Sequence, residues 1–587
     1  MYLKQTRNSK TGRTHLSMVH NYWDKEVGRS RTKTVETFGY LDELEKKYPD
    51  PIAYYKNIVA GINLDMKLEA AEYTIIAKKN QTLELGARNR KNYGYIIIMK
   101  LFYELGLDRF LINRQRRETK IEFNTASIMK LLIISRILAP GSKKKDFEER
   151  GRYFDFEKKN AFTLPDVYRA LSFFSRYDHH IQRQIHERIT KKYGRNMELI
   201  YYDVTNYYFE IDSEDELRKK GYSKENRKSP IVQMGLAMDA GGLPVSYELF
   251  PGNESEKLYL RPMVSDLIRN YDAGKVIAVA DSAQNTGNNI YYLDKGRQGY
   301  VFSQSISGGG EAFKKYVTDP TGYVWQGEKY KRKSRVFRRE IQVDFERADG
   351  SFHKKKVLVD QRQIVFYSEK YAIRSRAKRE AVIKKAQKII SNPAAYTSAT
   401  SYGALKYIKN VEVDKKTGEI KAAKKGTPSF DIDKLRDEEK YDGFYSIVTN
   451  VFNEGEDQGK FDDDKIIEIY RGLWQIEDSF RVTKEELETR PVHLSREERI
   501  KAHFLICYIS LVIVRLIQKA TDHKHSPAKL IAAINNISCS HESENLFLFD
   551  YRCDITDDLG NSFGFDFTRQ RLSLKEIKKF LSEAKIT

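Results

Sequence analysis

One stretch of about one hundred residues restricts the possible folds more than any other part of the chain. It begins with MELIYYDVTNYYFE at 197–210, which is rich in the aromatic and β-branched residues typical of a strand. IVQMGLAMDAGGLPVSYELFPGN follows at 231–253, and its two apolar segments flank DAGG, a strong hairpin signal. These patterns predict three successive antiparallel strands.

The same stretch continues with alternating helices and strands. EKLYLRPMVSDLIRNY at 256–271 has a helical period, and Val276 to Ala280 are five consecutive apolar residues, as in a strand covered on both faces. A second helix is predicted in NNIYYLDKG and a further strand in GYVFSQS. The predicted order is β-β-β-α-β-α-β, which indicates an α/β core with a mixed sheet.

Two aspartates lie at positions in this core where burying a carboxylate is energetically unfavourable. Asp203 lies within the first strand, and Asp281 directly follows the apolar run. A carboxylate at the end of a buried strand requires a cation or hydrogen-bond donors, because it loses hydration there. Two local alternatives remain open: Asp281 as a helix N-cap or turn former within DSAQNTG, and Asp203 in contact with a neighbouring strand.

A third acid stands in YRGLWQIEDSFRVTK at 470–484. If this segment is one helix, a single stripe holds Tyr470, Trp474, Glu477, Arg481 and Lys484. A neighbouring apolar stripe predicts that the other side is buried. The stripe is also compatible with a solvated face held by ion pairs between successive turns.

Charge and composition narrow the class of partner. The 587 residues carry a net charge of +21, which favours a polyanion, nucleic acid before a membrane surface. Residues 311–390 alone hold 22 Lys and Arg against 10 Asp and Glu, a net charge of +12. The longest apolar run, 504–517, is shorter than a membrane span and is predicted to be a buried helix, so no membrane is expected.

Other features indicate a reducing cytoplasm and no nucleotide cofactor. The three cysteines have no C-x-x-C spacing, which disfavours disulfides and a zinc site. The glycine triplet at 308–310 lacks the Lys-Ser/Thr of a P-loop.

The changes of pattern along the chain predict six regions. HLSMVHNYW and TKTVETFGYL predict an early hairpin, and helical periodicity dominates 92–195. The regions are an N-terminal hairpin and helix region (1–85), a helical DNA-binding module (86–195), the first part of the core (196–307), a basic β-rich insertion (308–445), the last part of the core (446–525) and a C-terminal region (526–587).

Together the three acids resemble the ribonuclease H-like DDE transposases. The chain is similar to insertion-sequence transposases of the branch with a β-rich insertion domain between the second Asp and the Glu. The signature of their last helix is Tyr, two residues, Arg, three residues, Glu, six residues, Lys. Tyr470, Glu477 and Lys484 match it, whereas Leu473 stands at the Arg position.

The resemblance implies a fold, a reaction and a site. The fold is α/β: a ribonuclease H-like mixed-sheet core with a β-rich insertion and an N-terminal helical module. Asp203, Asp281 and Glu477 are expected to hold two Mg²⁺ ions, for which Mn²⁺ can substitute. The expected reaction cuts the ends of an insertion sequence and joins them to target DNA. The residues expected to contact DNA are Tyr470, Arg471, Trp474, Arg481 and Lys484, with Arg471 and Arg481 as candidates for the missing guanidinium.

The implied partners are the double-stranded DNA of the terminal inverted repeats, the target DNA and a second copy of the chain in a homodimer on DNA. The implied location is the prokaryotic cytoplasm, at the nucleoid. Two rival functions stay open: a nuclease that cuts without joining strands, and a catalytically silent DNA-binding or repressor protein.

Overall fold

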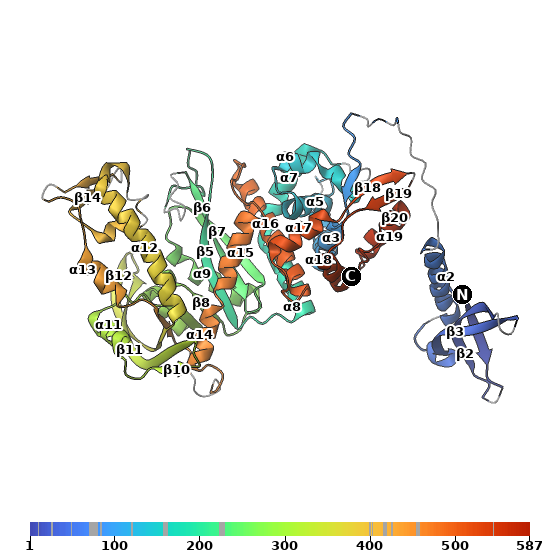
Figure 1. The fold of residues 1–587 in the computed structure, drawn as a ribbon, viewed down its shortest axis with the longest axis horizontal. Helices are drawn as coiled ribbons and strands as arrows, with labels where there is room; N and C mark the ends of the chain where they lie inside the picture. Colours follow the sequence, from blue (N-terminus) through green and yellow to red (C-terminus); the bar gives the residue numbers. More distant parts are fainter. Residues whose placement is uncertain are drawn as a thin grey trace. The chain divides into compact units, whose positions relative to one another are not determined.

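The chain folds into two compact units, Met1–Glu84 and Leu85–Thr587. The structure, a computed structural model, describes residues 1–9, 11–24, 28–48, 50–69, 80, 82, 85–118, 121–156, 162–221, 229–397, 401, 403–414, 419–423, 426–452, 458–543 and 545–586. Figure 1 shows the fold of both units. Further division of the second unit stays a prediction.

The first unit is a small antiparallel sheet with helices. Its strands β1 (Tyr2–Arg7), β2 (Thr14–Asp24) and β3 (Arg29–Tyr40) pair in the order β1-β2-β3, and α1 (Leu41–Leu44) and α2 (Pro51–Glu69) follow. The predicted hairpin is confirmed as β2 and β3, although residues 25–27 of its turn lie outside the described residues.

The second unit is built around a mixed sheet that confirms the predicted order of elements. The elements are β5 (Leu199–Tyr208), β6 (Ile231–Asp239), β7 (Pro244–Pro251), α9 (Leu260–Asn270), β8 (Ile277–Ala280), α10 (Gly287–Lys295) and β9 (Gly299–Ser303). β5 pairs antiparallel with β6 and parallel with β8, and β8 pairs parallel with β9. The core is therefore an α/β, ribonuclease H-like sheet.

The longest strands of the predicted insertion extend this sheet. The full order is β10-β11-β12-β17-β9-β8-β5-β6-β7. The added strands are β10 (Val324–Gln326), β11 (Tyr330–Glu346), β12 (Phe352–Tyr367) and β17 (Phe444–Thr449). β17 pairs with both β12 and β9, so it joins the long β11–β12 hairpin to the core.

The rest of the predicted insertion consists of helices and short strands on either side of the hairpin in the sequence. It comprises α11 (Glu311–Thr318), α12 (Glu369–Ser391), β13 (Ile408–Lys409), β14 (Val411–Val413), β15 (Ile420–Ala422), β16 (Ser429–Phe430) and α13 (Ile432–Glu439). Ala386 and Ile389 of α12 pack with Tyr407 and Ile420 in a small core of their own.

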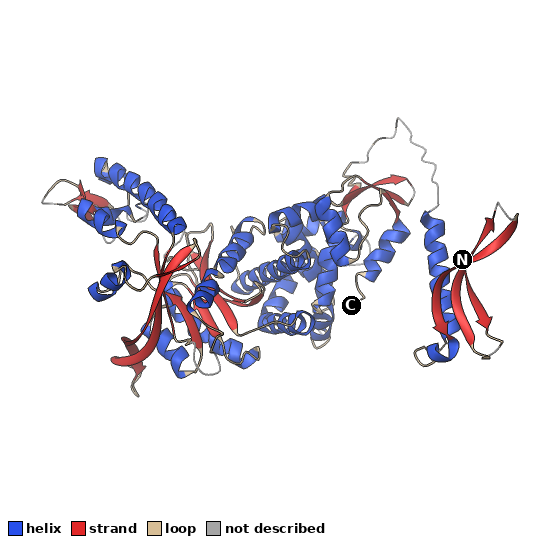
Figure 2. Cartoon of the chain, turned by 60° about the horizontal axis from the view of Figure 1, so that its bottom comes forward, coloured by secondary structure: helices blue, strands red, loops and turns tan. Residues whose placement is uncertain are grey.

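Helices cover both faces of the sheet (Figure 2). Tyr202 and Ala280 point to the face that packs with α9 and α10. Tyr201 and Val279 point to the opposite face, which packs with α14 (Asp463–Arg471), α15 (Trp474–Glu485) and α16 (Glu497–Ala520). The alternation of strand residues thus assigns Asp203, like Tyr201, to the face of α14 and α15.

The helical region packs around α16. It contains α3 (Tyr95–Glu104), α4 (Leu107–Gln115), α5 (Thr125–Leu138), α6 (Lys143–Glu148), α7 (Leu164–Arg176) and α8 (Asp178–Tyr193). α16 is long and apolar enough to cross a bilayer, but 94% of its most apolar window is buried inside the protein. The prediction that this run is a buried helix is confirmed.

The C-terminal region shares a sheet with the start of the helical region. β18 (Ser538–Ser543) pairs with β19 (Leu546–Phe549) and with β4 (Arg90–Asn92), and β20 (Arg571–Ser573) completes the order β20-β19-β18-β4. α17 (Pro527–Asn536), α18 (Asp554–Phe563) and α19 (Leu574–Glu583) accompany it. One hydrophobic core runs from Tyr93 to Ala584.

The prediction of a single helix over 470–484 is wrong. α14 ends at Arg471 and α15 begins at Trp474, with a tight turn at Gly472 and Leu473. The backbone N–H of Leu473 donates to the carbonyl of Tyr470, an i to i−3 bond that narrows the helix here. Gly472 is required because a Cβ at this position would lie 2.1 Å from the hydroxyl of Tyr201.

Candidate active site

The register of two parallel strands sets Asp203 opposite Asp281. Ile200 pairs with Ala278 and Tyr201 with Val279; continuing this register by two residues reaches the two aspartates. Neighbouring strands lie about 4.8 Å apart, so Asp203 in the middle of β5 lies beside the residue that follows β8, which is Asp281. The topology therefore brings the two predicted aspartates to neighbouring positions.

Both aspartates are half-buried and accept backbone hydrogen bonds. Asp281 Oδ1 accepts from the N–H of Ala283 at 2.9 Å, which makes Asp281 the N-cap of the short turn after β8, as the local alternative proposed. Asp203 Oδ1 accepts from the N–H of Val204 at 2.7 Å. Each carboxylate keeps further acceptor capacity for a cation.

Helix α15 packs along β5, the strand that carries Asp203. Before the helix, Gly472 lies against Tyr201. Toward its end, Lys484 Nζ donates to Thr205 Oγ1 at 2.7 Å. Glu477 stands between these two contacts, as Asp203 stands between Tyr201 and Thr205. Its side chain is exposed, and within the described part of the chain no hydrogen bond or ion pair holds its carboxylate.

The pKa of Tyr445 on β17 is affected by the charges of both Asp281 and Glu477. Burial raises the pKa of the Tyr445 phenol, the Tyr470 hydroxyl lowers it, and the charges of Glu477 and Asp281 contribute to the rise. Tyr470 packs with its ring centroid 5.9 Å from that of Tyr445. Burial raises the pKa of Tyr470 too, with a contribution from Asp281. Both acids therefore act on the Tyr445 phenol, and Asp281 acts on Tyr470 as well.

The acids do not form a closed cage. Among the described residues no group of three His, Cys, Asp or Glu side chains is gathered tightly enough to hold a metal ion. The donor set nevertheless fits magnesium, because three carboxylates from β5, β8 and α15 offer oxygen ligands only.

The predicted DNA-contacting residues have different surroundings. Trp474 is 62% exposed at the first residue of α15. The Arg471 guanidinium stacks over Tyr330 at 4.4 Å from the ring centroid. Arg481 forms ion pairs with Asp478, Glu485 and Glu486, so the ion-pair interpretation of the stripe holds for this residue.

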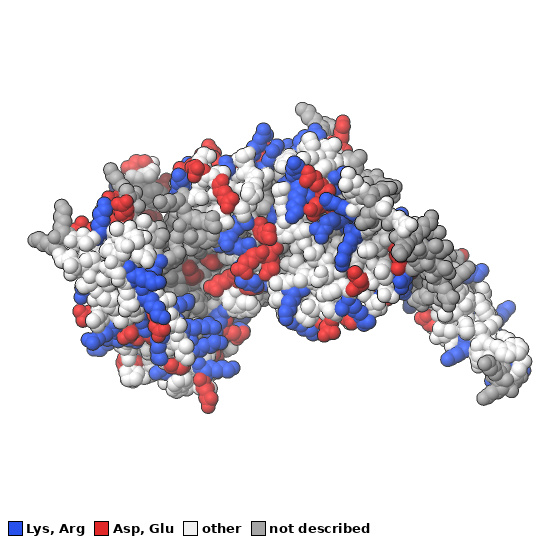
Figure 3. Space-filling view, turned by 45° about the horizontal axis from the view of Figure 1, so that its top comes forward, with Lys and Arg blue, Asp and Glu red and all other residues white. Residues whose placement is uncertain are grey.

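The basic hairpin uses several of its cations internally. Figure 3 shows Lys and Arg side chains gathered over the part of the second unit that carries β10 and β11. Arg332 binds both Asp463 and Asp464 of α14, and Arg335 lies 3.9 Å over the Tyr316 ring. Arg338 pairs with Asp360 at the surface.

Sequence reasoning missed Tyr445 and the link between the hairpin and α14. Tyr330 donates to Asp464 at 2.8 Å, Ser334 donates to Asp463 at 2.7 Å, and Arg362 pairs with Asp463. With Arg332, two carboxylates thus anchor four side chains of the hairpin. The signal available in the sequence was the run of three aspartates at 462–464. Acids at the start of a helix are candidate ion-pair partners for the basic insertion.

Comparison with protein families gives two matches. A model described as the transposase DDE domain matches residues 208–513, just over half of the chain. A model described as the IS1634 family transposase, N-terminal domain, matches residues 3–71, which lie in the first unit. No curated protein matches the chain. With a mixed α/β sheet, a transposase DDE domain model that matches just over half of the chain and an IS1634 N-terminal match in the first unit, the chain belongs to the DDE-domain transposases of insertion sequences.

Proposed function

We propose that this transposase cuts phosphodiester bonds at the ends of an insertion sequence and transfers the freed 3′ ends to target DNA. The observation that carries the proposal is the parallel register that sets Asp203 opposite Asp281, with α15 and Glu477 running along the same strand.

In this proposal Asp203, Asp281 and Glu477 hold two divalent cations, Mg²⁺ or in its place Mn²⁺. Bound there, such ions supply an activated water and neutralise charge on the phosphate. Asp203, on the strand beside Asp281 and along which α15 packs, would serve as a ligand to both ions. Glu477 is exposed and Asp281 is held by its backbone hydrogen bond, so we expect the glutamate side chain to move when the ions bind.

The flanking residues position the DNA. Lys484 and Arg471 offer charge to backbone phosphates, and exposed Trp474 offers a ring face on which an unpaired base stacks. Arg481 contributes once its acidic partners release it. The DNA comprises the terminal inverted repeats and the target, two copies of the chain act on one DNA complex, and the reaction takes place in the cytoplasm.

Replacement of Glu477 tests the proposal. Glu477→Gln should keep the binding of DNA that carries the element end and lose at least about a hundredfold of Mg²⁺-dependent nicking, as for removal of an essential group. Glu468→Gln, at an exposed glutamate of the neighbouring helix α14, is the matched control and should nick like the wild type. Unchanged nicking by Glu477→Gln would contradict the assigned role.

Strand transfer separates the rival functions. A pre-cut element end should become covalently joined to a target plasmid in the presence of Mg²⁺. Nicking without joining would identify a nuclease, and end binding without nicking would identify a DNA-binding or repressor protein.

A further inference from the structure

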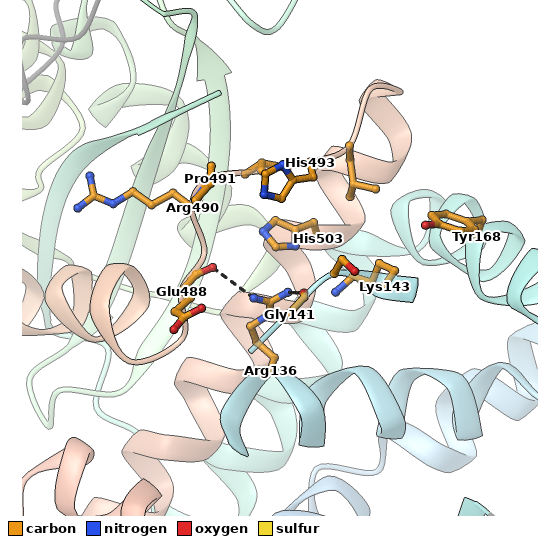
Figure 4. A pocket seen from close by; sticks show the side chains of 12 residues that line it. Arg136, Gly141, Lys143, Tyr168, Glu488, Arg490, Pro491, His493 and His503 are labelled. Carbon is orange, nitrogen blue, oxygen red and sulfur yellow. Dashed lines mark hydrogen bonds between the residues drawn. The ribbon is translucent and has the colours of Figure 1, made fainter. Parts of the chain in front are cut away.

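A cavity of about 240 Å³ lies between the helical region and the loop that follows α15. Its lining comes from the end of α5, the start of α6, α7, residues 488–494 and α16, and includes Arg136, Lys143, His493 and His503 (Figure 4). None of the predicted catalytic or DNA-contacting residues lines it.

Buried basic side chains converge on this cavity. Arg136, Lys143 and His503 are only 3%, 4% and 5% exposed. Figure 4 shows their polar groups turned toward the same space, whereas Arg490 points away from it. The charge of Arg136 lowers the pKa of both Lys143 and His503, after the larger effect of burial, so the three groups act on one another.

The buried positive charge is incompletely compensated. Arg136 donates to the carbonyl oxygens of Leu487 and Glu488, both at 3.2 Å, and of Gly141 at 2.9 Å. Within the described residues no carboxylate forms an ion pair with Arg136, and its buried Nε–H has no acceptor. Lys143 is paired with Asp146 at 3.5 Å. One buried acid thus faces two buried cations.

A buried cation without a counter-ion has lost its hydration. Only an anion or hydrogen-bond acceptors in the protein can compensate for that loss. The guanidinium fork matches the oxygen geometry of phosphate, and an ammonium adds a compact point charge. We propose that this cavity binds a phosphoryl oxyanion through Arg136 and Lys143. Because Arg136 also holds the carbonyls directly after α15, the bound anion fixes the chain that leaves the helix of Glu477.

Two sources supply this chemistry. A DNA backbone phosphate is one, and that assignment rests on the proposed function; inorganic phosphate is the other. Binding of inorganic phosphate to the full-length chain in the absence of DNA does not depend on catalysis.

Thermal unfolding of the full-length protein tests the site. Inorganic phosphate should raise the unfolding temperature of the wild type more than chloride at the same ionic strength. Lys143→Met should weaken the apparent phosphate affinity at least about tenfold, as for loss of one charge-assisted hydrogen bond. Lys144→Met, the adjacent exposed lysine with a surface partner in Glu148, is the matched control and should respond like the wild type.

A second measurement tests the phosphate site without any substitution. Tungstate soaked into wild-type crystals should occupy the cavity, which reads the site without any substitution. Equal phosphate responses of Lys143→Met and Lys144→Met, or an empty cavity in tungstate, would overturn the proposal.

If Lys143→Met binds phosphate weakly but DNA normally, the occupant is free phosphate; weakened binding of both identifies a DNA phosphate. Glu477→Gln should keep the phosphate response, so failure of the proposed reaction is distinguishable from failure of this site.

Discussion

Gly472 allows α15 to lie directly on β5. Its backbone dihedral angles are ordinary for a helix, so its requirement is one of space: a Cβ would lie 2.1 Å from the Tyr201 hydroxyl and 2.6 Å from its Cζ. Gly472→Ala should therefore push the start of α15 away from the strand, destabilise the fold by about 1–3 kcal/mol and reduce Mg²⁺-dependent nicking.

The control for this change is Gly310→Ala, where an added Cβ meets no atom within 4 Å. Thermal unfolding and a nicking assay on both variants check the prediction. Wild-type stability and nicking in Gly472→Ala would show that the helix does not depend on this close approach.

Lys143 should give stability a distinctive dependence on pH. Burial, above all, lowers its pKa to about 8 from the ordinary 10.5. Between these two values the unfolded chain binds a proton that the folded chain has released, so folding becomes more favourable as the pH rises. Lys143→Met removes this effect.

The difference in free energy of unfolding, wild type minus Lys143→Met, should rise by up to about 3 kcal/mol across that window. Urea unfolding of both proteins in phosphate-free buffer measures it. A difference that stays constant with pH would mean that the lysine is as well solvated in the folded protein as in the unfolded chain.

The candidate site could be predicted only where local pattern and chemistry coincide. Asp203 and Asp281 stood out because an acid within a strand of the core, or directly after a buried apolar strand, is costly. Tyr445 carries no such mark in the sequence, since tyrosine is ordinary on a strand. Its place in the sheet follows from the pairing of β17 with β9, which no local pattern specifies.

At the scale of elements, ion pairs hold the β11–β12 hairpin against α14. Asp463 binds Arg332 and Arg362, and the Arg362 side chain is only 9% exposed. Removing the carboxylate leaves a buried guanidinium without its ion-pair partner. Asp463→Asn should therefore destabilise the protein by about 3 kcal/mol.

Asp360→Asn is the matched control on the same hairpin, because its pair with Arg338 is solvent-exposed on both sides. The control should cost less than about 1 kcal/mol. Guanidinium unfolding midpoints compare the two variants with the wild type. Equal small losses would indicate that the hairpin is held by strand pairing alone.

The order of elements was more predictable than their pairing. β5 to β9 with α9 and α10 follow from periodicity and from the turn at DAGG, which are local signals. The pairing of β12 with β17 and of β4 with β18 joins residues far apart in the chain, so neighbouring sequence contains no record of it. The long segment at 470–484 was predicted as one helix because the close contact of Gly472 with Tyr201 is likewise a tertiary property.

At the scale of the whole molecule, the catalytic sheet shares its core with the helical and C-terminal regions. Phe504 and Leu511 of α16 are fully buried within a cluster that also contains Ile133 of α5 and Leu171 of α7. α16 therefore cannot keep its apolar surface covered when the helical region is removed. The predicted regions differ in pattern, but one cluster of buried apolar side chains extends from Tyr93 to Ala584.

This shared core predicts which fragments fold. A chain that begins at Leu85 keeps the second unit whole and should unfold in one cooperative transition near the temperature of the same unit in the full-length protein. A fragment of residues 196–525 lacks α5, α7 and the strands that pair with β4, so the exposed apolar faces of α16 should make it aggregate or unfold without a cooperative transition. Circular dichroism melting and size-exclusion chromatography compare the two fragments. Cooperative melting of a monomeric 196–525 fragment would show that the sheet supports its own core, because the apolar surface of α16 would then be covered without the helical region.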